Sequence, residues 1–440
     1  MKNKTGIIVP EILLPKKGIN LFKWSVVACD QYTSQLSYWQ KVKQIIGSAP
    51  STLNIIFPEV YLEDKGKQAR IKRIRATMKK YLANVLEPVK GFVLVDRRTS
   101  HVKSRKGLIV ALDLENYNYH RGSQSLIRPT EGTVLNRLPP RIAIRKEALI
   151  ESPHILVLID DPKKTVIEPL FKDRNKFPKI YDFKLMQNGG HIKGYQITKA
   201  GDINRIIQNI AKLADIKSFN RKYGVKNKKL LLFASGDGNH SLATARATWD
   251  IIKKRLSPTA RQVHPARYAL VELLNVHDTG LEFEPIHRVL FNVKLDEALR
   301  EMASYFSKEG SCFNYKLNKI IKSVKTKKLN IHTIGFVSGK TFGVLEVMKP
   351  KYNLAVATLQ GFLDEFMRRH PEAKIDYVHG DSVVAQLGKQ NNNIGFFLPT
   401  MNKHDLFKTV ILDGALPRKT FSLGEAEEKR FYLECRKIKP

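Results

Sequence analysis

The chain reads LLLFASGDGNHSLATAR over residues 230–246. Its apolar start has the length and bulk of a core strand, and Gly236 and Gly238 permit the sharp reversal that follows. Apolar residues then recur at helical spacing, which predicts a helix that Asn239 or Ser241 caps. A strand, a tight turn and a helix in this order point backbone N–H groups and the positive end of a helix dipole at whatever lies above the strand. We therefore expect an anion-handling site.

Four polar side chains give this turn its candidate chemistry. Asp237 and His240 can each move a proton, so we predict that both are catalytic. Asp237 is also the expected metal ligand, while Asn239 and Ser241 are expected to bind phosphate. The alternative is a structural turn whose polar residues serve only as caps. The segment is neither a Walker A loop nor the Gly-x-Ser-x-Gly elbow of α/β-hydrolases, because the residues that define those motifs are not there.

The composition is that of a globular protein. The 440 residues suffice for two or three domains. No apolar run approaches the ~20 residues of a membrane span, and Met1–Pro10 contains no apolar core of a signal peptide. The three cysteines, Cys29, Cys312 and Cys435, make no CxxC pair. We expect a cytoplasmic protein with no membrane partner and neither a disulfide framework nor structural zinc.

The net charge of +35 raises the question of nucleic-acid binding. Lysine is spread over almost every polar segment, without interleaved aromatic residues or a recognisable binding module. In the basic helix expected over 68–86, apolar Ile71, Ile74 and Met78 recur at helical spacing, so its cations should face solvent. We expect the charge to attract small anionic substrates rather than a specific nucleic acid.

Strand-like and helix-like segments alternate along the chain, which predicts a mixed α/β or α+β fold. The expected strands are 24–28, 91–95, 108–112, 155–159, 230–233, 268–274, 333–337 and 342–347. The expected helices are 37–46, 68–86, 203–214, 242–256, 295–306, 359–369 and 403–412. The lysine-rich segment 316–330 is the expected seam between a large unit, 1–314, and a smaller α/β subdomain, 331–440.

Polar side chains also gather outside the 236–241 turn. Segment 25–35 ends an expected strand in polar residues, which is where α/β folds bind ligands. Glu131 lies among hydroxyls and arginines, and we predict that it is a general base with Arg128 and Arg141 binding phosphate. A surface salt-bridge loop is the alternative. Lys419 follows a glycine turn and is expected either to help clamp phosphate or to lie in an exposed loop.

Together, several of these segments resemble the uncharacterised family DUF1015 across nearly the whole chain. The matching segments are 27–35, 123–141, 233–245, 264–277, 281–288 and 416–436. That family is distantly similar to free-serine kinases of the ParB/sulfiredoxin-like superfamily, which phosphorylate L-serine to O-phosphoserine. Residues 237–241 match that superfamily's Asp-Gly-His-His-Arg signature in part, with Asn239 in place of the first His and Ser241 in place of the Arg. If that Arg holds phosphate, another cation must do so here.

The resemblance implies a ParB/sulfiredoxin-like α+β core with large insertions and a C-terminal subdomain that packs on the site. It also implies phosphoryl transfer between a nucleotide, ATP or ADP with Mg²⁺, and a small hydroxyl amino acid, above all L-serine. Two alternatives stay open. The same site would serve a phosphoserine phosphatase, and the charge would serve a ParB-like nucleic-acid-binding protein.

Overall fold

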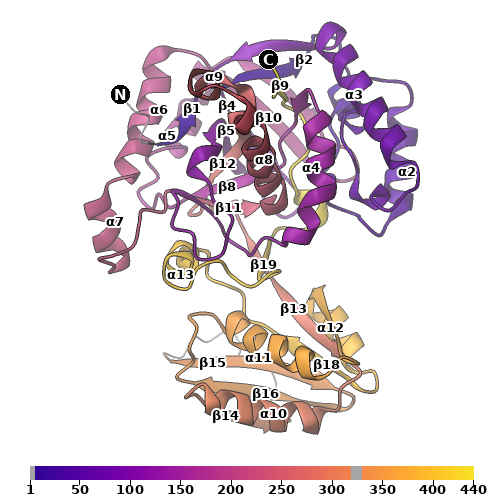
Figure 1. The fold of residues 1–440 in the computed structure, drawn as a ribbon, viewed down its shortest axis with the longest axis vertical. Helices are drawn as coiled ribbons and strands as arrows, with labels where there is room; N and C mark the ends of the chain where they lie inside the picture. The colour runs from indigo at the N-terminus through magenta and orange to yellow at the C-terminus, as the bar shows by residue number, and fades with distance from the viewer. Residues whose placement is uncertain (1–4, 319–329) are drawn as a thin grey trace. The chain divides into compact units, whose positions relative to one another are not determined.

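The protein divides into two compact units in a computed structural model that describes residues 5–318 and 330–440 (Figure 1). Unit 1 runs to Glu282 and also contains Leu423–Pro440, whereas unit 2 is Phe283–Ser422. The seam expected over 316–330 therefore falls inside unit 2, and its residues 319–329 lie outside the described part of the chain. The last segment of the chain belongs to unit 1.

Unit 1 is built on a mixed sheet with the strand order β6-β11-β8-β12-β5-β4-β10-β9, and β1 pairs with β5. Its strands are β1 (Ile7–Ile8), β4 (Phe92–Arg98), β5 (Arg105–Asp113), β6 (Ile127–Pro129), β8 (Leu156–Ile159), β9 (Lys179–Lys184), β10 (His191–Ile197), β11 (Phe233–Asp237) and β12 (Tyr268–Asn275). β6 runs parallel to β11 and β8 runs parallel to β12, while the other neighbours are antiparallel. The mixed fold class predicted from the sequence is confirmed.

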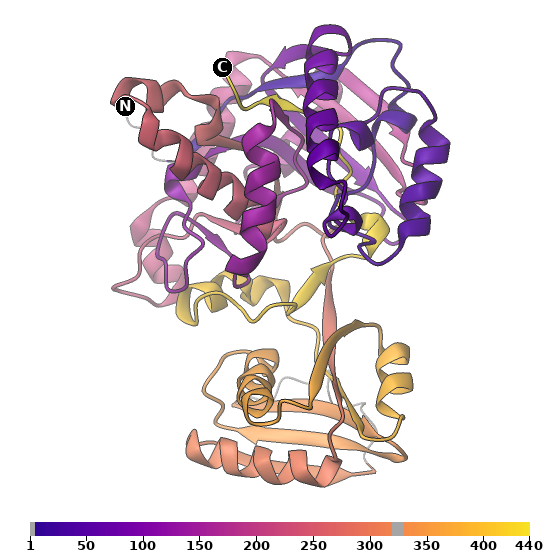
Figure 2. The ribbon, with the colours of Figure 1, turned by 45° about the vertical axis from the view of Figure 1, so that its right-hand side comes forward.

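Successive side chains of a strand point to opposite faces of the sheet. Other elements of unit 1 cover both faces, so a core cluster forms on each side. In β4, Val93 and Val95 belong to a core cluster that also contains residues of α2 (Leu36–Ile46), α3 (Lys67–Asn84) and the C-terminal segment. Phe92 and Leu94 belong to a second cluster, with residues of α6 (Ala200–Leu213) and α8 (Asn239–Ile252). The helices of unit 1 are α1 (Leu21–Trp24), α2 (Leu36–Ile46), α3 (Lys67–Asn84), α4 (Leu138–Glu147), α5 (Glu168–Lys172), α6 (Ala200–Leu213), α7 (Ile216–Tyr223), α8 (Asn239–Ile252) and α9 (Pro258–Val263). Figure 2 shows this layering from a second direction.

Two short sheets complete unit 1. β2 (Glu11–Pro15) pairs with β3 (Leu86–Lys90), and β7 (Ile150–Glu151) pairs with β20 (Arg436–Lys437). The second pairing holds the C-terminal segment on the unit.

Unit 2 has its own antiparallel sheet, in the order β14-β16-β15-β18-β13-β17, and β19 also pairs with β13. Its strands are β13 (Phe283–Phe291), β14 (Cys312–Leu317), β15 (Ile331–Ser338), β16 (Thr341–Met348), β17 (Lys374–His379), β18 (Asn393–Phe397) and β19 (Phe421–Leu423), the last ending in unit 1. Its helices are α10 (Leu295–Lys308), α11 (Ala355–Arg369), α12 (Asp381–Gly388) and α13 (Leu406–Leu412). Phe336, Phe362 and Phe366 lie in its core.

Most elements lie where the sequence predicts them, and α3 shows why. Ile71, Ile74 and Met78 are buried, as their spacing requires, and its lysines face solvent. The strand predicted over 24–28 is wrong. A short helix, α1, occupies Leu21–Trp24 instead. The side chain of Asn20 caps the start of this helix by accepting the Lys23 N–H.

Across residues 5–318 and 330–440, every helix falls short of the length or the apolar character that crossing a bilayer requires.

Candidate functional site

The turn between β11 and α8 reverses at Gly238 alone. Gly236, which the sequence also places in the turn, lies within β11, because the strand extends to Asp237 rather than ending at residue 233. Gly238 lies in the left-handed region at φ 72° and is itself the N-cap of α8, which has no side-chain cap. The expected capping by Asn239 or Ser241 is therefore wrong, because the helix begins directly after the glycine. A side chain at 238 would also meet the backbone of Ile155 at 3.0 Å. The N-terminus of α8 therefore lacks a side-chain cap, and its positive dipole end favours negative charge nearby.

Asp237 ends β11 and forms an ion pair with a residue from the far end of the chain. Its Oδ1 accepts the Gly238 N–H at 2.9 Å, and its Oδ2 lies 3.1 Å from Nζ of Lys429. The Lys429 side chain is only 10% exposed, so the pair lies largely out of bulk water. Lys429 therefore places a positive charge beside the turn.

Ser241, in the first turn of α8, belongs to a second polar chain. Its Oγ lies 2.9 Å from Nε2 of His154, whose Nδ1 lies 2.8 Å from the hydroxyl of Tyr432. The Tyr432 oxygen in turn accepts the backbone N–H of Cys29 at 3.1 Å. A carboxylate oxygen of Asp30 lies 3.7 Å from the same Nε2. The arrangement fixes the imidazole ring of His154 between a hydroxyl on each side.

The groups around Asp30 keep its carboxylate ionised. Burial by itself would raise the pKa of Asp30, but His154, the Gln31 side chain and Lys429 together lower it below its ordinary value. Burial, together with neighbouring Cys29 and Asp30, raises the pKa of Tyr432 well above the usual range, so its hydroxyl stays neutral. Lys429 acts on both Asp237 and Asp30, and thereby joins the two polar groups into one site.

A cavity of about 160 Å³ opens beside this site. Its polar end is formed by Ser241, His154, Cys29 and Tyr432. The segment before α3, α3 itself and α4 contribute apolar lining residues, namely Ile55, Phe57, Ile71, Ile74, Met78 and Ile144. Charged side chains line the cavity as well, namely Glu59, Arg75, Arg141, Arg145, Glu147 and Glu151. Pockets of this kind, apolar with a few converging polar groups, are typical of ligand sites.

Glu131 follows β6, the strand that pairs with β11 beside the turn. β6 runs parallel to β11 with Pro129 opposite Ser235, and both the N–H and the hydroxyl of Thr130 donate to the Ser235 carbonyl, at 3.1 and 2.7 Å. Glu131 comes just after the end of β6, and Asp237 is the last residue of β11. Because the two strands are parallel, both residues lie at the same edge of the sheet. The Nε2 of His240 accepts the Val134 N–H at 3.3 Å, which ties that side chain to the loop after Glu131.

The two predicted phosphate-binding arginines already have partners within the protein. The Arg128 guanidinium is buried and donates to the carbonyls of Ser125, at 2.9 Å, and Lys229, at 2.6 Å. Burial lowers the pKa of Arg128 to about 10, so it stays charged and holds backbone rather than phosphate. Arg141 lines the cavity, but its Nε lies 2.9 Å from a Glu59 oxygen in a two-pronged ion pair. Arg128 thus has a structural role, and phosphate binding by either arginine stays a prediction.

Lys419 lies in unit 2, where its carbonyl accepts a hydrogen bond from Arg288 at 3.0 Å. Its part in a phosphate clamp stays a prediction.

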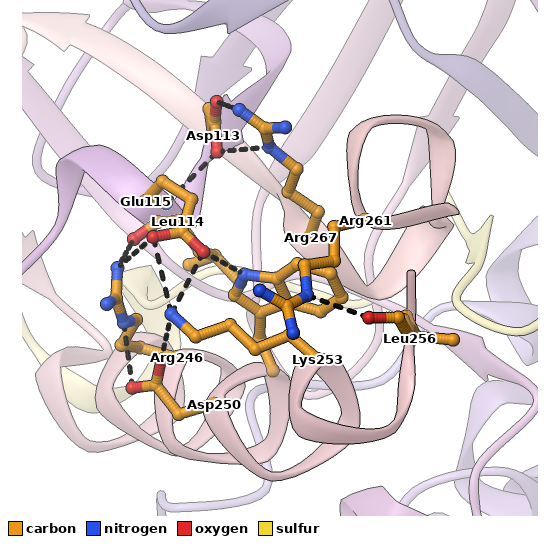
Figure 3. A network of polar contacts seen from close by, with 10 residues as sticks. Asp113, Leu114, Glu115, Arg246, Asp250, Lys253, Leu256, Arg261 and Arg267 are labelled. Carbon is orange, nitrogen blue, oxygen red and sulfur yellow. Dashed lines mark hydrogen bonds and ion pairs between the residues drawn. The ribbon is translucent and has the colours of Figure 1, made fainter. Parts of the chain in front are cut away.

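A polar network holds the outer face of α8 in place (Figure 3). Glu115, which follows β5, accepts from Trp249 at 2.7 Å and pairs with Lys253 at 3.0 Å. Arg246 pairs with Asp250 one turn further along α8, at 2.9 Å. These contacts fix the helix axis, and so fix where its N-terminus points.

Among the described residues, only Glu297, Glu301 and His370 of unit 2 gather three side-chain ligand atoms closely enough for an ion. Asp237 is not in such a group, so a metal ion there would need ligands from the substrate. Mg²⁺ is commonly bound in this way, by one or two carboxylates together with phosphate oxygens.

A family model matches most of the chain. The model of a family described as "Protein of unknown function (DUF1015)" matches residues 13–366. The chain belongs to the DUF1015 family. The family resemblance predicted from the sequence is thereby confirmed, and no curated protein matches this DUF1015 chain.

Solved structures similar to this DUF1015 protein are distant. One is a free serine kinase in complex with AMP, with 11% identity, a TM-score of 0.39 and coverage of 75% of this chain and 92% of that one. A mutant free serine kinase in complex with ADP has 10% identity, a TM-score of 0.40 and the same coverage. A conserved hypothetical protein from Pyrococcus furiosus has 12% identity and a TM-score of 0.36, with 75% of this chain and 95% of that one covered.

Sequence reasoning did not single out four residues of the candidate site: Asp30, His154, Lys429 and Tyr432. Asp30 lies in the segment 25–35 that the sequence marks as a ligand-binding edge, so a signal was present. His154 and Lys429 carry no motif of their own, and they reach the turn only through the fold.

Proposed function

We propose that this DUF1015 protein transfers a phosphoryl group between a nucleotide, ATP or ADP, and the hydroxyl of a small amino acid, L-serine being the expected one. The observation that carries the proposal is the position of Lys429, 3.1 Å from Asp237 at the N-terminus of α8. Phosphoryl transfer depends on positioning and on neutralising the charge of the phosphoryl oxygens. A largely buried cation next to a helix N-terminus supplies both.

The remaining side chains have distinct roles in this proposal. Glu131 takes the proton of the substrate hydroxyl, because it follows the neighbouring strand at the same sheet edge as the turn. His240 donates a hydrogen bond to a phosphoryl oxygen, and Asn239 and Ser241 orient the same group from the first turn of α8. Asp237 would hold Mg²⁺ together with the nucleotide phosphates. The bound ion would neutralise the charge between the phosphates.

The cavity offers a place for the non-reacting part of a ligand. Its isoleucine-rich wall suits an apolar or flat group, and its polar end contains Ser241 and His154. The positive charge spread over the chain would draw anionic substrates toward the protein, an effect that falls with salt.

The test is a direct assay of the purified full-length protein with Mg²⁺, either ATP or ADP, and a panel of hydroxyl amino acids. We expect nucleotide-dependent formation of O-phosphoserine from L-serine, and much less product in the Asp237→Asn variant. Absence of any phosphorylated amino acid with either nucleotide would contradict the proposal. A second reaction without nucleotide, starting from O-phosphoserine, distinguishes the alternative: release of inorganic phosphate there would identify a phosphatase.

A further inference from the structure

We infer that Ser241 is a nucleophile and carries the phosphoryl group as a covalent intermediate. This inference rests on the proposed phosphoryl transfer and adds that transfer proceeds in two displacements. The Ser241 hydroxyl lies 2.9 Å from the imidazole of His154, at the polar end of the cavity. A hydroxyl within hydrogen-bond reach of a base, with the base oriented by a third group, is the arrangement that activates a serine.

The hydrogen-bond partners of His154 suit it to this role. When Nδ1 carries the proton, it donates to the Tyr432 oxygen 2.8 Å away, and Nε2 is then available to accept the Ser241 proton. The imidazolium that forms would lie with Nε2 3.7 Å from the carboxylate of Asp30, which is ionised and stabilises the added charge. Tyr432 fixes the ring, and Asp30 stabilises the charged state.

The position of Ser241 also suits an attack on phosphorus. It lies in the first turn of α8, a helix of fourteen residues whose N-terminus has no side-chain cap. The developing negative charge on the phosphoryl oxygens would meet the positive helix end and the Lys429 ammonium group. Transfer of an acyl group, which carries less negative charge than a phosphoryl group, would need less positive charge at this position.

The two steps balance without an added reagent. In the first, the Ser241 oxygen forms a bond to the terminal phosphorus of the nucleotide, the bond between that phosphorus and its bridging oxygen breaks, and the Ser241 proton passes to His154. The shortened nucleotide leaves with the electron pair. In the second, the hydroxyl of the amino acid attacks the same phosphorus, Glu131 takes its proton, and the Ser241 oxygen leaves and regains a proton from His154.

The experiment traps the intermediate by withholding the amino acid. Full-length protein is incubated with Mg²⁺ and nucleotide labelled in its terminal phosphate, either ATP or ADP, and analysed by intact mass and peptide mapping. We expect one phosphoryl group on Ser241, which L-serine then discharges as O-phosphoserine. A nucleotide with a chiral terminal thiophosphate should give product with retained configuration at phosphorus, because two inversions cancel.

Variants separate the nucleophile from a structural hydroxyl. Ser241→Ala should not take up the label, and its rate of phosphoryl transfer should fall by about 10³-fold or more. Thr248→Val is the matched control: it removes another buried hydroxyl of α8, which donates only to the Thr244 carbonyl at 2.7 Å, and should retain both. His154→Ala should lose the label, with partial recovery in added imidazole.

The outcomes distinguish the two proposals. Transfer with inverted configuration, no label and an active Ser241→Ala variant would overturn the intermediate and leave the proposed function intact. Label on Ser241 that no hydroxyl amino acid discharges would support the nucleophile and contradict the proposed function. If a folded protein gives neither label nor product, both are overturned.

Discussion

Lys429, near the end of the chain, forms an ion pair of 3.1 Å with Asp237 at the end of β11. Asp237→Asn keeps the size of the side chain, so we expect the fold to persist while turnover falls by about 10²-fold or more. Lys429→Met should lower turnover as well, and in the double variant the two losses should not add, because the residues act as one unit. Steady-state kinetics measure this.

A solvent-exposed pair provides the control for this prediction. Lys179 and Asp182 lie 2.8 Å apart on β9, where the lysine side chain is 52% exposed. Lys179→Met should leave turnover unchanged. Near-wild-type activity in a folded Asp237→Asn variant would remove Asp237 from the mechanism.

Glu131→Gln tests the general base. If Glu131 takes a proton only in the transition state, kcat should fall by about 10²-fold or more while KM for the amino acid stays nearly constant. Glu63→Gln, at an exposed position, serves as the control. A variant with unchanged kcat and a lower melting temperature would show that Glu131 belongs to a structural ion-pair loop.

Arg128 should behave differently from a ligand-binding arginine. Arg128→Ala leaves the carbonyls of Ser125 and Lys229 without their buried donor, so we expect a loss of about 2–4 kcal/mol in the free energy of unfolding. The nucleotide dissociation constant of the folded variant should stay within about twofold, since the guanidinium does not reach the site. Urea unfolding and a nucleotide titration measure the two effects. A stable variant with much weaker binding would restore the phosphate-binding role.

Glu151 should make folding stability depend on pH in the acid range. Burial by itself would raise its pKa, but Arg436 and Arg145 lower it below the ordinary value. A carboxyl whose folded pKa is depressed stabilises the protein above its unfolded pKa, and this stabilisation is lost as pH falls toward the folded pKa. Glu151→Gln should therefore cost about 3–5 kcal/mol near pH 7. The difference from wild type should shrink below about pH 4, the ordinary range of glutamate.

Urea unfolding over a series of pH values checks this prediction. Asp64→Asn, at an exposed carboxylate 4.0 Å from Arg70, should follow the wild-type curve closely. A Glu151→Gln variant that differs from wild type by a constant amount from pH 7 to pH 3 would show that the loss is one of packing rather than of charge.

The lysines of α3 test the meaning of the net charge. Lys72, Lys79 and Lys80 are exposed, so changing all three to Gln should leave kcat and stability unchanged. A small loss in kcat/KM that disappears as salt shortens the Debye length to ~8 Å is expected if they steer an anionic substrate. Sequence-specific duplex binding that these changes abolish would favour the nucleic-acid alternative instead.

Local patterns predicted most of the fold, because periodicity and turn chemistry are properties of neighbouring residues. The buried stripe of α3 and the glycine turn at 238 are both visible in the sequence. At the candidate site, sequence could indicate only what is local, the turn at 237–241, and the roles of its residues stay predictions. Lys429 and Tyr432 could not be placed from sequence, since long-range packing alone brings the C-terminal segment to β11. The backbone partners of Arg128 were equally hard to foresee, because one of them, the Lys229 carbonyl, comes from a distant segment.

The route of the C-terminal segment determines when this protein becomes competent during its synthesis. Arg430 pairs with Glu272 inside unit 1 at 2.9 Å, and both side chains are almost fully buried. Lys429, Arg430 and Tyr432 leave the ribosome only after all of unit 2. A nascent or truncated chain without this segment therefore has Asp237 and Glu272 without their cations, and His154 without its phenol. Synthesis of the segment that follows unit 2, rather than folding of the residues up to Glu282, is the event that completes the candidate site.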